Sequence, residues 1–149
     1  MKKVTIVILS LILFASALEA GELKGRFGVG LNWPGVQFRY CFNDSFLAEA
    51  KAQFSSNNIL VGGRGCFLLN EIPGNCSIIP YVGGEYNWVL SQYTTGGYVT
   101  GGFIGAEALV TNHIGISGDA GLYYVNVWSP YGGIDDWGLI FNVGLTYYF

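Results

Sequence analysis

The chain has 149 residues, which is enough for one domain and too few for two comfortable ones. Charged residues make up only 11% of it, against roughly 25% in an ordinary soluble domain, so a soluble enzyme with a usual charged surface is not expected. The 16% of aromatic residues argues against disorder, and a formal net charge of −3 without a basic tract argues against nucleic acid as a partner.

Residues 1–20 have the layout of a secretory signal peptide. Lys2 and Lys3 precede an apolar run at residues 4–14, and small residues follow it. An N-terminal membrane anchor is the alternative, but this run is shorter than the roughly 20 residues that a spanning helix needs. Cleavage fits after either Ala17 or Ala20.

The mature domain is expected to span residues 21–149 and to be built from strands. It has no uninterrupted apolar run of the length that a membrane helix needs, and glycine, 23 residues in the whole chain, recurs too often for long helices. Eight segments of about ten residues alternate between apolar and small or polar positions, as strands do. They lie at about residues 26–33, 36–42, 46–54, 59–69, 78–90, 98–110, 114–128 and 138–149.

Residues typical of turns separate these segments. Glycine, proline, asparagine and serine recur in the connectors, where their backbone and hydrogen-bonding properties favour reversal of the chain. The connectors are Pro34–Gly35, Asn43–Ser45, Ser55–Asn58, Asn70–Ser77, Ser91–Gly97, Thr111–His113 and Ser129–Trp137. An even number of alternating segments of this length predicts an eight-stranded antiparallel up-and-down β-barrel that crosses a membrane.

The sparse polar face of the segments predicts that the barrel is polar inside and apolar outside. Its charges are balanced and interspersed with glycines, which suits the narrow interior of an eight-stranded barrel. The predicted interior charge network contains Arg26, Arg39, Glu49, Lys51, Arg64, Glu85, Glu107 and Asp119. The alternative is a soluble sandwich or a lipocalin-like barrel, with the apolar face buried in a core and the charges in water.

Aromatic residues are expected at both rims, where membrane barrels carry aromatic girdles. All four tryptophans fall beside the connectors that follow the first, fifth and seventh segments. This first girdle contains Trp33, Trp88, Trp128 and Trp137, joined by Tyr93, Tyr98, Tyr124 and Tyr131. The opposite rim is expected to carry Tyr40, Phe42, Phe46, Tyr147 and Phe149.

The last segment resembles the closing strand of bacterial outer-membrane barrels. It ends in Leu145-Thr146-Tyr147-Tyr148-Phe149, with Leu145, Tyr147 and Phe149 on the apolar face. With the signal peptide and the eight segments, this resembles the small eight-stranded outer-membrane barrels that include OmpX and the membrane domain of OmpA. The resemblance implies a multi-pass protein of the bacterial outer membrane, in contact with its lipid, monomeric, and recognised by the barrel assembly machinery. No periplasmic domain is expected after Phe149.

The hairpin connectors allow the register of three strands to be predicted. If Phe42 faces Phe46, then Arg39 faces Glu49, and if Phe54 faces Ile59, then Glu49 also faces Arg64. Glu49 is therefore expected between two arginines. The cluster admits two interpretations, a proton or ion relay and a plug of salt bridges, and the narrow lumen favours the plug.

Three cysteines leave at least one thiol unpaired. In the predicted register Cys41 and Cys66 face inward on either side of Leu47. They lie about 9–10 Å apart, beyond the roughly 7 Å that a disulfide spans. Cys76, in a long connector, is free to approach either one, so the disulfide state is left open, and a metal site would need more ligands than these residues supply.

No catalytic, metal or cofactor site is predicted. His113 is the only histidine, and Ser117 on the same face lies about 13 Å away along the strand, too far for a base to activate a nucleophile. A lipid-modifying enzyme and a narrow conduit for ions or small molecules remain alternatives to a non-enzymatic envelope barrel. The last outward connector is a possible contact surface, with Tyr131, Asp135, Asp136 and Trp137.

Overall fold

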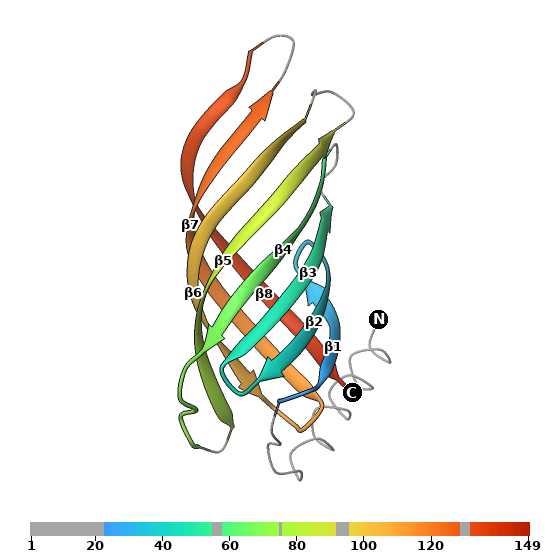
Figure 1. Cartoon of the computed structure of the whole chain (residues 1–149), viewed down its shortest axis with the longest axis vertical. Helices are drawn as coiled ribbons and strands as arrows, with labels where there is room; N and C mark the ends of the chain where they lie inside the picture. The colour runs from blue at the N-terminus through green and yellow to red at the C-terminus, as the bar shows by residue number, and fades with distance from the viewer. Residues whose placement is uncertain (1–22, 55–57, 75, 92–95, 129–131) are drawn as a thin grey trace, which may run out of the picture.

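The computed structural model describes residues 23–54, 58–74, 76–91, 96–128 and 132–149. Eight antiparallel strands pair in chain order and close into a barrel, with β8 back against β1 (Figure 1). The strands are β1 (Phe27–Asn32), β2 (Gly35–Asn43), β3 (Phe46–Phe54), β4 (Asn58–Leu68), β5 (Ser77–Ser91), β6 (Gly96–Leu109), β7 (Ile114–Trp128) and β8 (Ile134–Tyr148). Among the described residues, no helix has the length and apolar character of a membrane span.

The all-β class, the eight strands and the closed antiparallel barrel are confirmed, and the strands scatter around the expected length of about ten residues. The strands range from six residues in β1 to 15 in β5, β7 and β8. The last connector is shorter than predicted, because β8 starts at Ile134 and Tyr124 pairs with Trp137. Asp135 and Asp136 therefore belong to a strand, and Tyr131 lies outside the described residues, as does the predicted signal peptide.

The predicted register of the charged residues is confirmed. Arg39 pairs with Glu49, and Glu49 pairs in turn with Arg64. Phe54 pairs with Ile59 as expected.

The pairing of Phe42 with Phe46 is wrong, because the register shifts between Cys41 and Asn43 and it is Asn43 that pairs with Phe46. The Asn43 Oδ1 atom accepts the Ser45 amide at 2.8 Å, which tightens the turn and leaves one extra residue in β2.

The two faces of the barrel differ sharply in polarity. Every charged side chain of β1 to β7 lies on the inner face and is buried, while large apolar side chains are exposed on the outer face. Exposed outer residues occur on all eight strands, for example Leu31, Phe38, Phe54, Phe67, Leu90, Ile104, Leu122 and Phe141. A packed apolar core with a charged surface, as in a soluble sandwich, has the opposite distribution.

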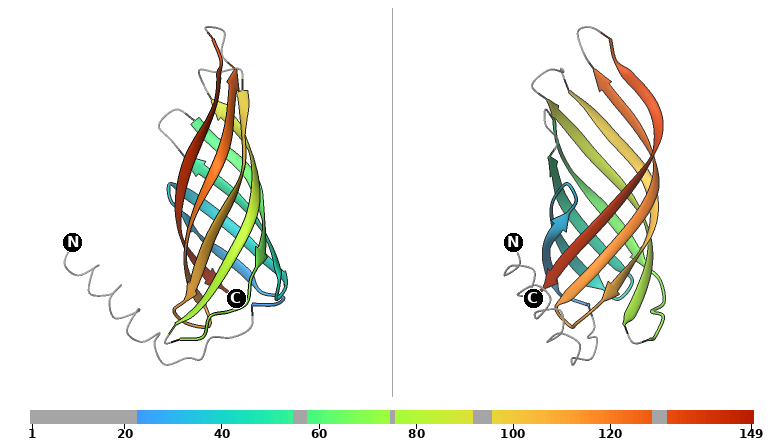
Figure 2. Two further views of the ribbon diagram at one scale, coloured as in Figure 1. Left: turned by 90° about the vertical axis from the view of Figure 1, so that its left-hand side faces the viewer. Right: turned by 180° about the vertical axis from the view of Figure 1, so that it is seen from behind.

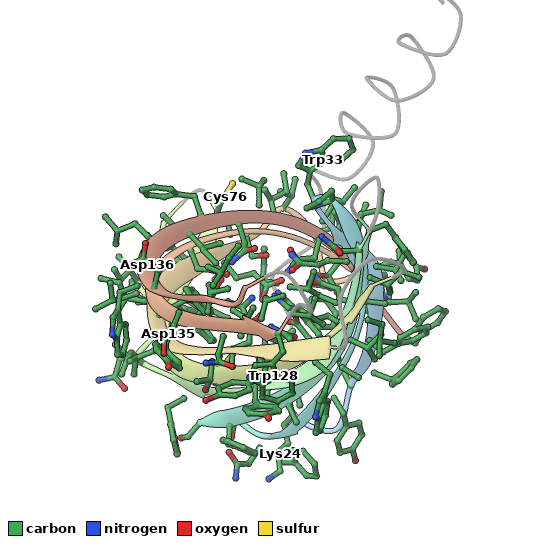
Figure 3. All side chains as sticks on the ribbon, turned by 90° about the horizontal axis from the view of Figure 1, so that it is seen from above. Lys24, Trp33, Cys76, Trp128, Asp135 and Asp136 are labelled. Carbon is green, nitrogen blue, oxygen red and sulfur yellow. The ribbon has the colours of Figure 1, made fainter. Side chains whose placement is uncertain are left out.

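Aromatic side chains cluster near both ends of the barrel. We call the end of the barrel that carries the β5–β6 and β7–β8 connectors the upper end. Toward this end, ring centroids of tyrosine–tryptophan pairs lie 4.9–6.2 Å apart. These pairs are Tyr86–Trp88, Tyr98–Trp128 and Tyr124–Trp137. Contacts at the lower end include Tyr40–Phe42 and Tyr147–Phe149. Trp33 also projects outward, 80% exposed (Figure 3), and Tyr93 of the predicted girdle lies outside the described residues.

The upper rim of the barrel rises gradually from β1 round to β8 and drops at one place, between β8 and β1, which we call the step. Paired residues form one row around the barrel, which starts at Gly144 of β8, passes through Asn32 of β1 and returns to β8 at Ile134. The row is thus displaced along β8 by ten residues (144 − 134) in one circuit, the stagger by which tilted strands close a barrel. The hairpins end on this row, so the wall rises from β1 toward β8 and drops where β8 meets β1 (Figure 2).

Candidate functional site: the charged lumen

Seven of the eight predicted charged side chains meet inside the barrel. Each is at most 9% exposed, and they come from six different strands. The seven are Arg39, Glu49, Lys51, Arg64, Glu85, Glu107 and Asp119. Arg26 is the exception, because it precedes β1 and is only half-buried at the lower rim, where its guanidinium donates to the carbonyl oxygen of Asn112.

Arg39 of β2 organises the lower part of the network. Its Nε lies 2.7 Å from Glu49 Oε2 on β3, and its Nη1 lies 3.0 Å from Glu107 Oε2 on β6. The same guanidinium reaches the hydroxyl of Ser117 on β7 and that of Tyr148 on β8, each at 3.3 Å. One side chain therefore cross-links five strands, since an arginine carries five N–H donors on a planar group.

Arg64 of β4 organises the upper part. Its Nε lies 2.9 Å from Glu85 Oε2, its Nη2 lies 2.9 Å from Asp119 Oδ2, and its Nη1 lies 3.8 Å from Glu49 Oε1. The guanidinium carbon sits 3.8 Å from the centre of the Phe103 ring, a cation–π contact. Lys51 forms an ion pair with Glu85. Because Glu49 contacts both arginines, the two parts make one continuous network.

Three tyrosines provide hydroxyl donors to the carboxylates. Tyr148 donates to Glu107 at 2.9 Å, Tyr123 donates to Glu85 at 3.0 Å, and Tyr81 donates to Asp119 at 3.3 Å. These contacts are not predicted from the sequence, although Tyr123 and Tyr148 fall on its polar face. A tyrosine at an inward position among glycines and charges is the signal that could have identified them, because a buried phenol needs a hydrogen-bond partner.

Inward glycines make room for this network. A Cβ on Gly115 would overlap the Glu107 carboxylate, and a Cβ on Gly105 would come within 2.6 Å of the Asp119 side chain and 2.7 Å of the Tyr81 ring. Real Cβ contacts are essentially never this short. The alternation of glycine with charged residues, visible in the sequence, therefore reflects the volume that the buried side chains occupy.

Apolar side chains lie on the inner face above and below the charged layer. Toward the upper end, Val89 and Val99 are 6% and 5% exposed, and Leu60, Val125, Val127 and Ile140 pack with the buried apolar residues. The lower layer contains Leu23, Cys41, Leu47, Cys66, Leu68, Ile79 and Leu109. The prediction of an inner face that is polar throughout is therefore wrong at both ends of the lumen. The two apolar layers place the ion pairs in a dry environment.

The three cysteines are all free thiols, and Cys41 and Cys66 lie buried on either side of Leu47 as predicted. Cys76 is exposed, in the connector between β4 and β5 (Figure 3). No group of three or more histidine, cysteine, aspartate or glutamate side chains in the described part of the chain is placed to hold a metal ion.

The remaining predicted residues lie apart from the network. His113 is in the turn between β6 and β7, where its Nδ1 lies 2.9 Å from the carbonyl oxygen of Tyr148 and its ring stacks on Tyr147. The residues predicted as an assembly signal, Leu145, Tyr147 and Phe149, are exposed on the outer face.

The arrangement is suited to holding strands together. The lumen charges comprise three cations and four carboxylates, and every one of them has an ion-pair partner. Removing one member of such a buried set leaves an uncompensated charge, which is far more costly than losing an exposed pair. The pairs cross-link strands and lie between apolar layers, so a relay of charge through this network would have to break paired charges.

The chain matches no known family model, no curated protein and no solved structure.

Proposed function

We propose that this chain is a non-enzymatic integral β-barrel of the bacterial outer membrane, with a closed, charge-filled lumen and a structural or surface-interaction role in the envelope. The observation that carries this proposal is the distribution of polarity. The strands expose apolar side chains outward and bury paired charges inward, which is the arrangement expected of a barrel surrounded by lipid. A closed barrel also satisfies the backbone pairing that hydrocarbon demands.

Two further features support a membrane location. Aromatic clusters near both ends match the girdles with which membrane barrels contact the two interfaces. The predicted signal peptide would direct export, and the closing strand resembles those that the barrel assembly machinery recognises. Lipid and that machinery are therefore the proposed partners, and the barrel is proposed to act as a monomer.

The interior favours a closed plug over a conduit. Ion pairs of 2.7–3.0 Å join strands across the lumen, and apolar residues lie above and below them. Planar-bilayer recordings of the refolded protein should show no conductance above the baseline of protein-free detergent. Discrete channels that vanish in Arg64→Ala would instead support the conduit.

A substitution at Ile104 tests the membrane location. Ile104 lies on the outer face of β6 and is 68% exposed. In a bilayer, Ile104→Arg should destabilise the barrel by about 2–4 kcal/mol, because it places a charge in hydrocarbon, whereas Ile104→Ala, the matched control, should cost much less. Urea unfolding in lipid vesicles measures both variants.

Cell fractionation gives a second readout of location. The native chain should be found in the outer-membrane fraction and migrate faster on gels before heating than after. Recovery in a soluble fraction, together with an Ile104→Arg variant as stable as the native chain, would contradict the proposal and favour a secreted soluble barrel.

A further inference from the structure

The step in the upper rim leaves one edge of β8 without a partner strand. β1 pairs with β8 from Gly144 to Tyr148, and the Trp33 amide donates to the Val143 carbonyl oxygen at 3.0 Å. Among the described residues, no strand pairs with this side of β8 above that hydrogen bond. The other side of β8 pairs with β7 up to Ile134, so the free edge runs along a strand that is otherwise in the sheet.

The backbone groups at this edge can be assigned by parity. In an antiparallel strand the N–H and C=O of one residue point to the same side, and successive residues alternate between sides. The Val143 carbonyl accepts the amide of Trp33, the residue after β1, and the Phe149 amide donates to Phe27 of β1. Both β8-side residues have odd numbers, so the odd-numbered residues of β8 face β1 and, above it, the step. The residues whose backbone faces the step are Asp135, Trp137, Leu139 and Phe141, each with one donor and one acceptor. The Trp137 amide already donates to Asp136 Oδ1 at 2.8 Å, so among the described residues the free donors of this edge are the amides of Asp135, Leu139 and Phe141.

The side chains along this edge are among the most exposed apolar groups of the barrel. Trp137, Leu139 and Phe141 are 62%, 71% and 74% exposed. Between Trp137 and Val143 the edge carries no charge, no proline and no bulge, the features by which exposed edge strands usually avoid pairing. In the membrane of the proposed function, backbone groups beside such side chains lack water as a partner, and each unpaired group is costly.

We propose that the upper edge of β8, from Asp135 to Val143, binds an extended segment of another protein as an added antiparallel strand. Only an extended backbone presents donors and acceptors at the spacing of every second residue along one line. The segment would continue the line of β1 upward from Trp33. It would be apolar on the outward face, and a lysine or arginine at its upper end would meet Asp135 and Asp136.

A second copy of this chain is not the expected occupant. Two β8 edges that pair antiparallel are related by a twofold axis perpendicular to their common sheet, and this axis lies parallel to the membrane plane. Such a rotation reverses the upward direction of one of the two barrels. Two barrels inserted in the same orientation into one membrane therefore cannot make this contact, which is why the inference rests in part on the proposed function.

The test uses the refolded full chain in detergent and a synthetic peptide as the probe. The peptide spans the length of Asp135–Val143, alternates valine with threonine and ends in lysine. Two N-methylated forms of the peptide are compared. One is methylated at the amides of its odd-numbered peptide positions and the other at those of its even-numbered positions, so each form lacks the hydrogen-bond donors along one edge of the extended peptide. Binding of the unmodified peptide should be retained by one form and weakened more than about tenfold in the other, because only one edge bonds to β8.

Two variants of Leu139 locate the site. Leu139→Pro removes the edge-facing N–H and no bond to β7, and an edge strand tolerates proline, whereas Leu139→Ala shortens the same side chain and keeps the donor. The Pro variant should bind the peptide about tenfold more weakly than the Ala variant. If Leu139→Pro fails to fold, as judged by gel mobility before heating, the N-methylated peptides still decide the question.

Three outcomes would overturn the inference. They are no binding of the unmodified peptide, equal binding of both N-methylated forms, and a dimer of the chain itself that Leu139→Pro dissolves. Vesicle flotation of the same preparation is scored separately. A chain that binds the peptide but does not float contradicts only the proposed function, and one that floats without binding contradicts only this inference.

Discussion

Glu49 occupies the position in the lumen where the loss of one carboxylate affects most. Its carboxylate lies 2.7 Å from the guanidinium of Arg39 and 3.8 Å from that of Arg64. Glu49 thereby joins the two halves of the network, which these arginines organise. Its side chain is wholly buried, so water cannot replace it. Buried ion pairs contribute little when compared with well-packed apolar residues, yet breaking one is costly, because its partner stays charged.

Glu49→Ala should therefore lower the free energy of unfolding by about 3–5 kcal/mol. Glu71→Ala is the control, because Glu71 lies in the connector between β4 and β5 and its carboxylate contacts only Ser77 among the described hydrogen bonds. That variant should change stability by less than about 1 kcal/mol. Urea midpoints in one detergent compare the two, and equal midpoints would contradict the assigned role of the network.

Gly115 and Gly118 provide a matched pair on β7. A methyl group on Gly115 would collide with Glu107, whereas the nearest atom to a methyl group on Gly118 is a carbonyl oxygen 4.0 Å away. Gly115→Ala should cost about 1–3 kcal/mol through overpacking, and Gly118→Ala should be neutral or slightly stabilising. Thermal unfolding of both variants checks this, and similar losses would show that the inner glycines do not make space for the charges.

At the scale of elements, alternation predicted much of the fold and failed where pairing partners decide the outcome. A period of two is visible in sequence, so the eight strands and the inward position of Glu49 could be predicted. Strand length could not, because β8 extends only as far as β7 offers residues to pair with. Arg26 shares the parity of the inner face but precedes β1, and Val89 and Val99 show that inward positions need not be polar.

The free edge of β8 predicts an alternation in amide exchange. The amides of Ile140 and Asn142 face β7, while those of Leu139 and Phe141 face the step. In detergent and without a partner, the two edge-facing amides should exchange with solvent deuterium at least about tenfold faster than the two that are bonded, since exchange requires an open hydrogen bond. Nuclear magnetic resonance resolves the four amides, and uniform protection would indicate that the edge is already covered.

At the scale of the whole molecule, the layers inside the barrel and the orientation of its ends make one joint prediction about thiols. Cys41 and Cys66 are buried in the lower apolar layer, and Cys76 is exposed at the lower end, expected to face the periplasm. A polar maleimide reagent should therefore modify one thiol of the folded barrel and three after unfolding in urea.

In intact Gram-negative cells a maleimide too large to cross the outer membrane should leave Cys76 unmodified, and permeabilisation should expose it. Cys76→Ser is the control, since it should abolish labelling of the folded barrel altogether. Labelling of a second thiol in the native state would mean that water reaches the lumen. Labelling of Cys76 in intact cells would instead reverse the proposed orientation of the barrel. The step of β8 would then lie on the periplasmic side, and its partner would have to be a periplasmic protein.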